Sequence, residues 1–434
     1  MVALAAVIVQ PVSAADNLEV KFRAAKGRIV TELRSPKPEV REKALATLRE
    51  FPVPQAVDTL LQQGELTKYP DVARGSFDIL FSFANSVDVC KHLQTDLLQE
   101  LAANKVGTAG KVRLLVLLSS TEPQVQALLP KVFEQAAQSP GGLLLVATTI
   151  DEYAAAATPE NKRALLQMTE LPLFDTHYGL RRALVQALCK LNDKQAVNKL
   201  LQFHTTAEGE TRADIERRML QLSGLKPADR TDWPTWWKEK EAEFEFPAGP
   251  TRELELVANP GSASYYGLPL YGSKLVFIAD YSGSMQGAQL DAAKRELLGT
   301  IAQLPDGVRF NIIAFNSQVF PWKRELQPVS PESRKEAMAF VGAGQAAAMT
   351  NSYDALSAGL LQDCDAIYFL TDGAPTVGKL TKPFDIISSI TRTNRVRRAT
   401  INCIGIGVGG AGGTFDTFLN ELSTKNFGAY RKIN

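Results

Sequence analysis

The sequence contains few of the residues on which metalloenzymes and disulfide-stabilised proteins depend. Its three histidines, His92, His177 and His204, are too few and too scattered for a multi-histidine metal centre. Its four cysteines lie far apart without a Cys-x-x-Cys pair, which excludes a zinc knuckle or a disulfide-dense scaffold. Lysine and arginine number 48 against 47 aspartates and glutamates, so no global charge favours nucleic acid or an anionic membrane.

The overall composition is that of a folded protein. Of 434 residues, 45% are hydrophobic and 22% are charged, which is typical of globular domains. At about 100–200 residues per domain, this length indicates two or three domains with well-buried cores.

Residues 1–15 are predicted to be a signal peptide. A short apolar run at 1–9 is followed by Val12 and Ala14, which have the small-residue spacing of a signal-peptidase site. The run is shorter than the ~20 apolar residues that span a bilayer. No lysine or arginine precedes it, so an apolar N-terminal helix is the alternative. The prediction is an exported protein of a bacterial periplasm or cell surface.

Residues 16–230 are predicted to be helical, because apolar residues recur at the helical period. In the segment 38–48, Val40, Ala44 and Leu48 share one face, and a second helix follows at 55–61. The same pair recurs at 180–191 and 195–201, an offset of 195 − 55 = 140 residues. Further helices are expected at 77–84, 97–103, 112–118, 125–137 and 143–157.

Helix pairs of this size stack into an α-solenoid, because one pair cannot bury its apolar face alone. The segment resembles degenerate HEAT-type repeats, and an irregular helical bundle is the alternative. Residues 231–271 are interpreted as a tryptophan-rich cap and linker. Trp233, Trp236 and Trp237 are expected to close the end of the solenoid or pack on the next domain; an aromatic cage is the alternative.

Residues 272–434 alternate between strands and helices. Strands are expected at 275–279, 308–315, 366–370, 400–406 and 429–433, and helices at 290–304, 331–341, 352–361, 383–390 and 414–423. This order predicts a doubly wound, mainly parallel, Rossmann-like sheet with helices on both faces. Four arginines lie near the end of the fourth helix: Arg392, Arg395, Arg397 and Arg398. They are predicted to form a solvated face that complements the helix dipole, and a contact to a phosphate or an acidic partner is the alternative.

Oxygen-bearing side chains gather at the carboxyl ends of these strands, where such sheets bind ligands. Asp280, Ser282 and Ser284 follow the first strand, and Asp372 follows a later one. Thr350 lies at a loop-to-helix junction between them. Two carboxylates and three hydroxyls, without histidine or cysteine, suit Mg²⁺.

This Asp-x-Ser-x-Ser, Thr and Thr-Asp-Gly set resembles the metal-ion-dependent adhesion site (MIDAS) of a von Willebrand factor type A (VWA) domain. The resemblance covers roughly residues 272–434. It implies that Ser282, Ser284 and Thr350 offer hydroxyls to Mg²⁺ or Mn²⁺, and that Asp280 and Asp372 bind directly or through water. It also implies capture of a protein partner, through an Asp or Glu carboxylate, rather than catalysis. Met349 stands where the family often has a glycine before the threonine.

The sequence as a whole therefore predicts an exported, non-enzymatic binding protein with helical repeats as its scaffold. Two alternatives share the combination of helices and a VWA domain. One is an RNA-binding protein of the Ro type, and the other is an accessory subunit of an ATP-driven remodelling machine. A serine hydrolase is not expected, because Ser282 lies outside a Gly-x-Ser-x-Gly elbow.

Overall fold

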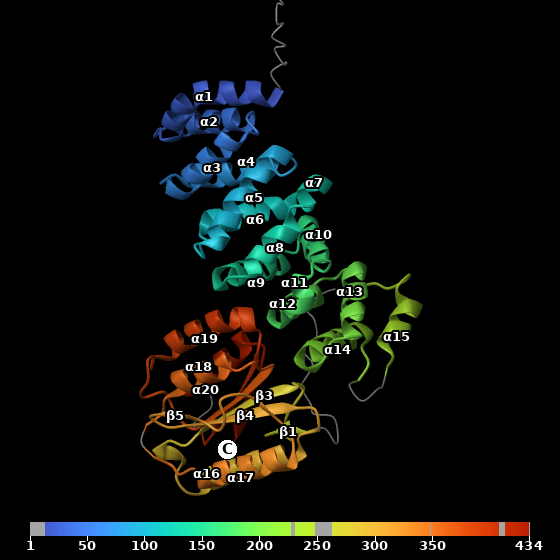
Figure 1. Ribbon diagram of the computed structural model, residues 1–434, viewed down its shortest axis with the longest axis vertical. Coiled ribbons are helices and arrows are strands. Elements are labelled where there is room, and N and C mark those ends of the chain that lie inside the picture. The colour runs from blue at the N-terminus through green and yellow to red at the C-terminus, as the bar shows by residue number, and fades with distance from the viewer. Residues whose placement is uncertain (1–13, 227–230, 248–262, 348, 408–412, 434) are drawn as a thin grey trace, which may run out of the picture. The chain divides into compact units, whose positions relative to one another are not determined.

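The computed structural model describes residues 14–226, 231–247, 263–347, 349–407 and 413–433 (Figure 1). Most of the predicted signal peptide at 1–15 lies outside the described residues. In the part that is described, no helix is both long enough and apolar enough to cross a membrane. The described residues form two compact units, one within 1–167 with 171–173 and one within 168–170 with 174–434.

The first unit consists of helices that pack mainly on their neighbours along the chain. Helix α3 contacts α1, α4 and α5, and α5 in turn contacts α6 and α8. This local pattern is that of stacked helix pairs, as the sequence predicted. The helices are α1 (Ala14–Leu33), α2 (Pro38–Arg49), α3 (Pro54–Leu66), α4 (Pro70–Ser82), α5 (Val87–Ala102), α6 (Thr108–Ser119), α7 (Pro123–Gln126), α8 (Leu129–Ala137), α9 (Pro140–Ala156) and α10 (Pro159–Met168).

Proline sets the start of many of these helices. Pro38, Pro54 and Pro70 occupy the first turns of α2, α3 and α4, where a missing N–H costs nothing because those amides have no intrahelical acceptor. The apolar faces are buried as their spacing predicted, with Ala44 and Leu48 of α2 fully inaccessible.

The second unit begins with further helices: α11 (Leu173–Thr176), α12 (Tyr178–Cys189), α13 (Lys194–His204), α14 (Gly209–Ser223) and α15 (Trp233–Lys240). Trp237 of α15 packs against α13. The Trp237 indole donates to Asn198 Oδ1 at 2.7 Å, and the Phe244 ring lies 5.0 Å from the Trp237 ring. Trp237 thus contacts a helix of the region 16–230, and the role of residues 231–271 as a cap and linker stays a prediction.

The second unit continues as a mostly parallel sheet. Its strand order is β5-β4-β3-β7-β8-β9, with β6 also paired to β4. Strands β3, β4, β7, β8 and β9 run parallel, and β5 and β6 are antiparallel to β4. The strands are β3 (Lys274–Asp280), β4 (Arg309–Phe315), β5 (Val319–Pro321), β6 (Gln327–Pro328), β7 (Ala366–Thr371), β8 (Thr400–Ile406) and β9 (Tyr430–Ile433), preceded by a hairpin of β1 (Ser264–Tyr265) and β2 (Leu268–Pro269).

Helices cover both faces of the sheet, which confirms the predicted doubly wound fold (Figure 1). Leu275 and Phe277 of β3 pack toward α16 (Ala288–Gln303) and α17 (Pro331–Ala343). Val276 and Ile278 pack toward α18 (Ser352–Leu361), α19 (Pro383–Arg397) and α20 (Thr414–Lys425). Because β3 is buried on both faces, its sequence is a continuous apolar run instead of an alternating one.

Helices α12 and α14 attach to the sheet at the amino ends of its strands. Arg182 of α12 is fully buried and donates to the Arg398 carbonyl and, at 2.8 Å, to Thr400 Oγ1 at the start of β8. Its Nε lies 2.8 Å from Asp214 Oδ2 of α14. A Cβ on Gly179 would lie 1.9 Å from a backbone oxygen of α19, so only glycine fits at this contact.

The prediction of a solvated arginine face is wrong for Arg398. Arg392, Arg395 and Arg397 are exposed, but Arg398 is buried and donates to Gln186 Oε1 at 3.2 Å. The reason is its left-handed backbone, with φ of 58° at the end of α19, which turns the chain into β8 beneath α12. Its guanidinium also lies over the Phe427 ring, 4.9 Å from the centroid.

Candidate metal site at the carboxyl edge of the sheet

Strands β3 and β7 lie side by side at the point where the strand order reverses. From β3 the chain continues to β4 on one side, and it later returns to β7 on the other side. Such a switch point leaves a crevice at the carboxyl ends of the two strands. The register pairs Ala279 with Leu370, so the next residues, Asp280 and Thr371, are neighbours.

Asp280 is the buried centre of this crevice. Its Oδ1 accepts the Ser282 N–H at 2.7 Å, and its Oδ2 accepts the Thr371 hydroxyl at 2.5 Å. Burial raises the pKa of Asp280 to about 6 in spite of these hydrogen bonds, and the charge of Asp372 adds to the rise. Among the described residues, no lysine, arginine or histidine forms an ion pair with Asp280 or Asp372.

Hydroxyl groups connect the two carboxylates. Ser282 Oγ lies 3.1 Å from Ser284 Oγ, and the Ser284 hydroxyl donates to Asp372 Oδ1 at 2.8 Å. A single 3-10 turn at Gly283–Met285 brings Ser284 back toward β7. Burial also raises the pKa of Asp372, which is only half-buried, and Ser284 is exposed. The site is therefore open on the side of Ser284 and Asp372.

Thr350 reaches the same place from the loop before α18. A Cβ on Gly373 would lie 3.7 Å from Ser284 Oγ and 3.9 Å from Thr350 Oγ1, so both hydroxyls face Gly373. The Thr350 N–H donates to Thr376 Oγ1, and its carbonyl accepts the Thr376 N–H, each at 2.9 Å. These two bonds fix the backbone of Thr350, although Met349 replaces the usual glycine and is exposed.

The structure thus gathers all five residues that the sequence proposed as ligands: Asp280, Ser282, Ser284, Thr350 and Asp372. Sequence reasoning gave no role to Thr371, which begins the Thr-Asp-Gly motif and donates to Asp280, and it missed Thr376, which holds the Thr350 backbone. The role of Thr371 could have been found, because it ends a parallel strand next to the one that ends in Asp280. No sequence signal marks Thr376.

The chemistry of these residues fits a hard divalent cation. Every side-chain donor is an oxygen, and the two carboxylates lack a positive partner in the described part of the chain. Mg²⁺ and Mn²⁺ prefer such oxygen sets, and Mg²⁺ commonly keeps some of its waters.

Residues 273–431 match the sequence profile of the von Willebrand factor type A domain. These residues form a VWA domain. The VWA domain matches human (Homo sapiens) inter-alpha-trypsin inhibitor heavy chain H4 with 31% identity over 183 residues. It matches heavy chain H3 of Bos taurus with 29% identity over 185 residues.

These matches cover part of each protein. Each includes 38% of this chain, and the chain spans about a fifth of the relatives' length, 19% for H4 and 20% for H3. A solved von Willebrand factor type A structure from Catenulispora acidiphila is 21% identical, with a TM-score of 0.32 over 37% of this chain and 38% of that one. VWA domains commonly mediate protein interactions and generally bind a divalent metal ion.

Proposed function

We propose that this protein binds a protein partner through a divalent cation, Mg²⁺ or Mn²⁺, held by the VWA domain. Asp280, Ser282, Ser284, Thr350 and Asp372 would hold the cation directly or through water. The observation that supports this proposal most strongly is the chain of hydrogen bonds from Asp280 through Ser282 and Ser284 to Asp372, which joins the ends of β3 and β7.

The charge of the site favours an acidic ligand from the partner. Its two carboxylates supply a charge of −2 in total, and its other three ligands are neutral hydroxyls. A cation bound there would supply a Lewis-acidic position for the partner's Asp or Glu side chain. Ser284 and Asp372 lie on the open side, so a carboxylate can approach without displacing the buried Asp280.

We propose binding and not catalysis. The Ser282 and Ser284 hydroxyls are bonded to each other and to the two carboxylates that would hold the cation, and not to a histidine base. All three histidines precede residue 273, so none belongs to the VWA domain. A nucleophile without an activating base is a poor catalyst of acyl transfer.

The helices are proposed to be the scaffold that carries this site. Helices α12 and α14 attach at the amino ends of the strands, through Arg182 and Thr400. A parallel strand rises about 3.3 Å per residue, so the seven residues of β3 separate the two edges by about 20 Å. We also propose export to a periplasm or cell surface, on the sequence pattern of residues 1–15.

A pull-down from native extract tests the proposal. The full chain is used with Mg²⁺, with EDTA, and as the Asp372→Ala variant. The matched control is Asp363→Ala, which removes an exposed carboxylate that pairs with Lys274 at the opposite edge of the same sheet. Retained proteins are identified by mass spectrometry, and RNA is measured in parallel.

We expect a partner that is retained by wild type and Asp363→Ala in Mg²⁺ and lost with EDTA and with Asp372→Ala. A partner retained under all conditions would contradict the proposal and assign binding to another surface. Recovery of RNA in place of a protein would favour the Ro-type alternative.

A further inference from the structure

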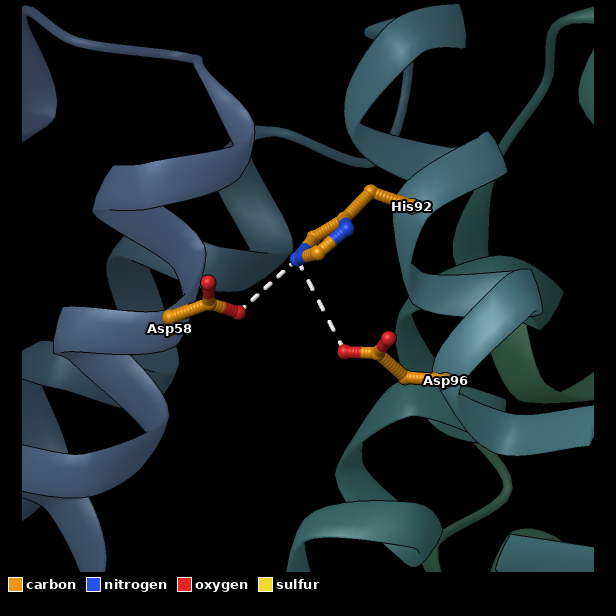
Figure 2. Close-up of side chains that lie close together, drawn as sticks. All are labelled: Asp58, His92 and Asp96. Carbon is orange, nitrogen blue, oxygen red and sulfur yellow. Dashed lines mark hydrogen bonds and ion pairs between the residues drawn. The ribbon is translucent and has the colours of Figure 1, made fainter. Parts of the chain in front are cut away.

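A second group of metal-ligating side chains lies in the helical unit, far along the chain from the VWA domain. Asp58 of α3 and His92 and Asp96 of α5 converge between these two helices (Figure 2). One donor atom from each residue lies within 4.8 Å of the other two. His92 and Asp96 are four residues apart, so they share one face of α5.

Both carboxylates approach the same nitrogen of the imidazole. His92 Nε2 lies 2.8 Å from Asp58 Oδ1 and 3.6 Å from Asp96 Oδ2 (Figure 2). A histidine that only bridged two carboxylates would present one ring nitrogen to each, because each nitrogen carries at most one proton. Three donor atoms within 4.8 Å of one another can instead be joined by a metal ion, with Arg113 keeping its bond to Asp96 Oδ2.

The distances from His92 Nε2 to the two carboxylate oxygens fit a small transition-metal ion. Zn²⁺ binds histidine nitrogen and carboxylate oxygen at about 2.0–2.2 Å, which places tetrahedral ligands about 3.3–3.5 Å apart. The two distances from Nε2 lie on either side of that value. A site with one imidazole and two carboxylates favours Zn²⁺ over Mg²⁺ and Ca²⁺, because those two cations prefer oxygen ligands.

The surroundings also resemble those of a metal site. Arg113 of α6 holds Asp96 Oδ2 at 3.2 Å and Glu100 Oε1 at 2.5 Å, so the Asp96 carboxylate is oriented by a second residue. The side chains of Asp58, His92 and Asp96 are 53%, 26% and 28% exposed. Water and ions can therefore reach the group, and water can complete the coordination.

We propose that Asp58, His92 and Asp96 form a Zn²⁺ site that ties α3 to α5. The site is independent of the proposed Mg²⁺ site. It lies in the first compact unit, it includes a histidine nitrogen among its donors, and it prefers a different metal. Its occupancy would stabilise the helical unit, because unfolding separates ligands that come from two helices.

A calorimetric titration of the full-length protein with ZnCl₂ tests this proposal. The variants are His92→Gln and Asp58→Asn, and the matched control is His204→Gln. His204 also pairs with a carboxylate, with its Nε2 3.2 Å from Glu216 Oε1, but it lacks the second carboxylate of a three-ligand group. Asp372→Ala is included to identify any Zn²⁺ that binds at the VWA domain.

We expect wild type, His204→Gln and Asp372→Ala each to bind one equivalent of Zn²⁺ with similar affinity. His92→Gln should bind this equivalent at least about tenfold more weakly. Asp58→Asn should show the same loss, and circular dichroism checks that both variants keep their helices. Co²⁺ in place of Zn²⁺ should give a visible absorption band that His92→Gln lacks. Equal Zn²⁺ binding by wild type, His92→Gln and Asp58→Asn would overturn the proposal, as would its loss in Asp372→Ala alone.

Discussion

Replacement of Arg182 by alanine should destabilise the second compact unit more than any exposed ion pair can. The guanidinium is fully buried, 2.8 Å from Asp214 Oδ2 and 3.4 Å from Glu210 Oε2. Burial alone would raise the pKa of Asp214, but the charges of Arg182 and Arg217 outweigh it and lower that pKa. Burial prevails at Glu210 and raises its pKa, although Arg182 opposes the rise.

The expected loss follows from the charges that the substitution leaves behind. Removal of one partner of a buried pair typically costs 3–5 kcal/mol, because the remaining charge stays buried without compensation. Asp214 keeps Arg217 at 2.6 Å, and Glu210 keeps the Thr400 hydroxyl at 3.0 Å. This partial compensation places the loss at about 3 kcal/mol, the lower end of that range.

Urea unfolding followed by tryptophan fluorescence measures this loss selectively. All four tryptophans, Trp233, Trp236, Trp237 and Trp322, belong to the second unit, so the signal does not report on the first. The control is Arg212→Ala on α14, whose pair with Glu216 is 47% and 42% exposed and should contribute about 0–1 kcal/mol. Adding Glu210→Gln to Arg182→Ala should recover part of the loss. A loss below about 1 kcal/mol in Arg182→Ala would show that Arg182 contributes no more than an exposed ion pair.

Three further predictions concern the site, the packing and the pH dependence. Thr371→Val removes a hydrogen bond to Asp280 and should weaken Mg²⁺ binding about 10–100-fold by calorimetry; unchanged affinity would contradict a positioning role. Gly179→Ala should destabilise the second unit by about 1–3 kcal/mol, because its Cβ would meet backbone, whereas Gly299→Ala meets no atom within 4 Å and should stabilise by up to about 1 kcal/mol. Equal urea midpoints for these two glycine variants would contradict the close contact between Gly179 and the backbone of α19. Burial raises the pKa of Glu210 above 4.5, so the folded state holds this proton more tightly than the unfolded state does. The free energy of unfolding of wild type should therefore fall as the pH rises from 4.5 to the raised pKa of Glu210. Glu210→Gln should flatten this fall in urea midpoints above pH 4.5, and an unchanged profile would show that Glu210 does not cause it.

The strands and helices with strong patterns were predictable to within a few residues. Helix α18 and strand β8 have the bounds that the sequence predicted, 352–361 and 400–406. Strands β5 and β6 were missed because two or three residues are too short to show a period. Helix α19 continues to Arg397, past the predicted end at 390, because no glycine or proline interrupts it.

Contacts between distant segments were not predictable from one sequence. Arg182 and Thr400 are 218 positions apart, and neither lies in a motif. The group of Asp58, His92 and Asp96 depends on how α3 packs on α5, which hydrophobic periodicity does not specify. The proposed Mg²⁺ ligands were predictable because parallel strands end at a common edge, so residues that follow them must meet.

A calorimetric Mg²⁺ titration of wild type, Asp372→Ala and Asp363→Ala tests the proposed metal site most directly. We expect one Mg²⁺ site in wild type and Asp363→Ala, and its loss in Asp372→Ala with the fold intact by circular dichroism. Equal Mg²⁺ binding by all three proteins, or none by wild type, would contradict a metal site at the carboxyl edge of the sheet.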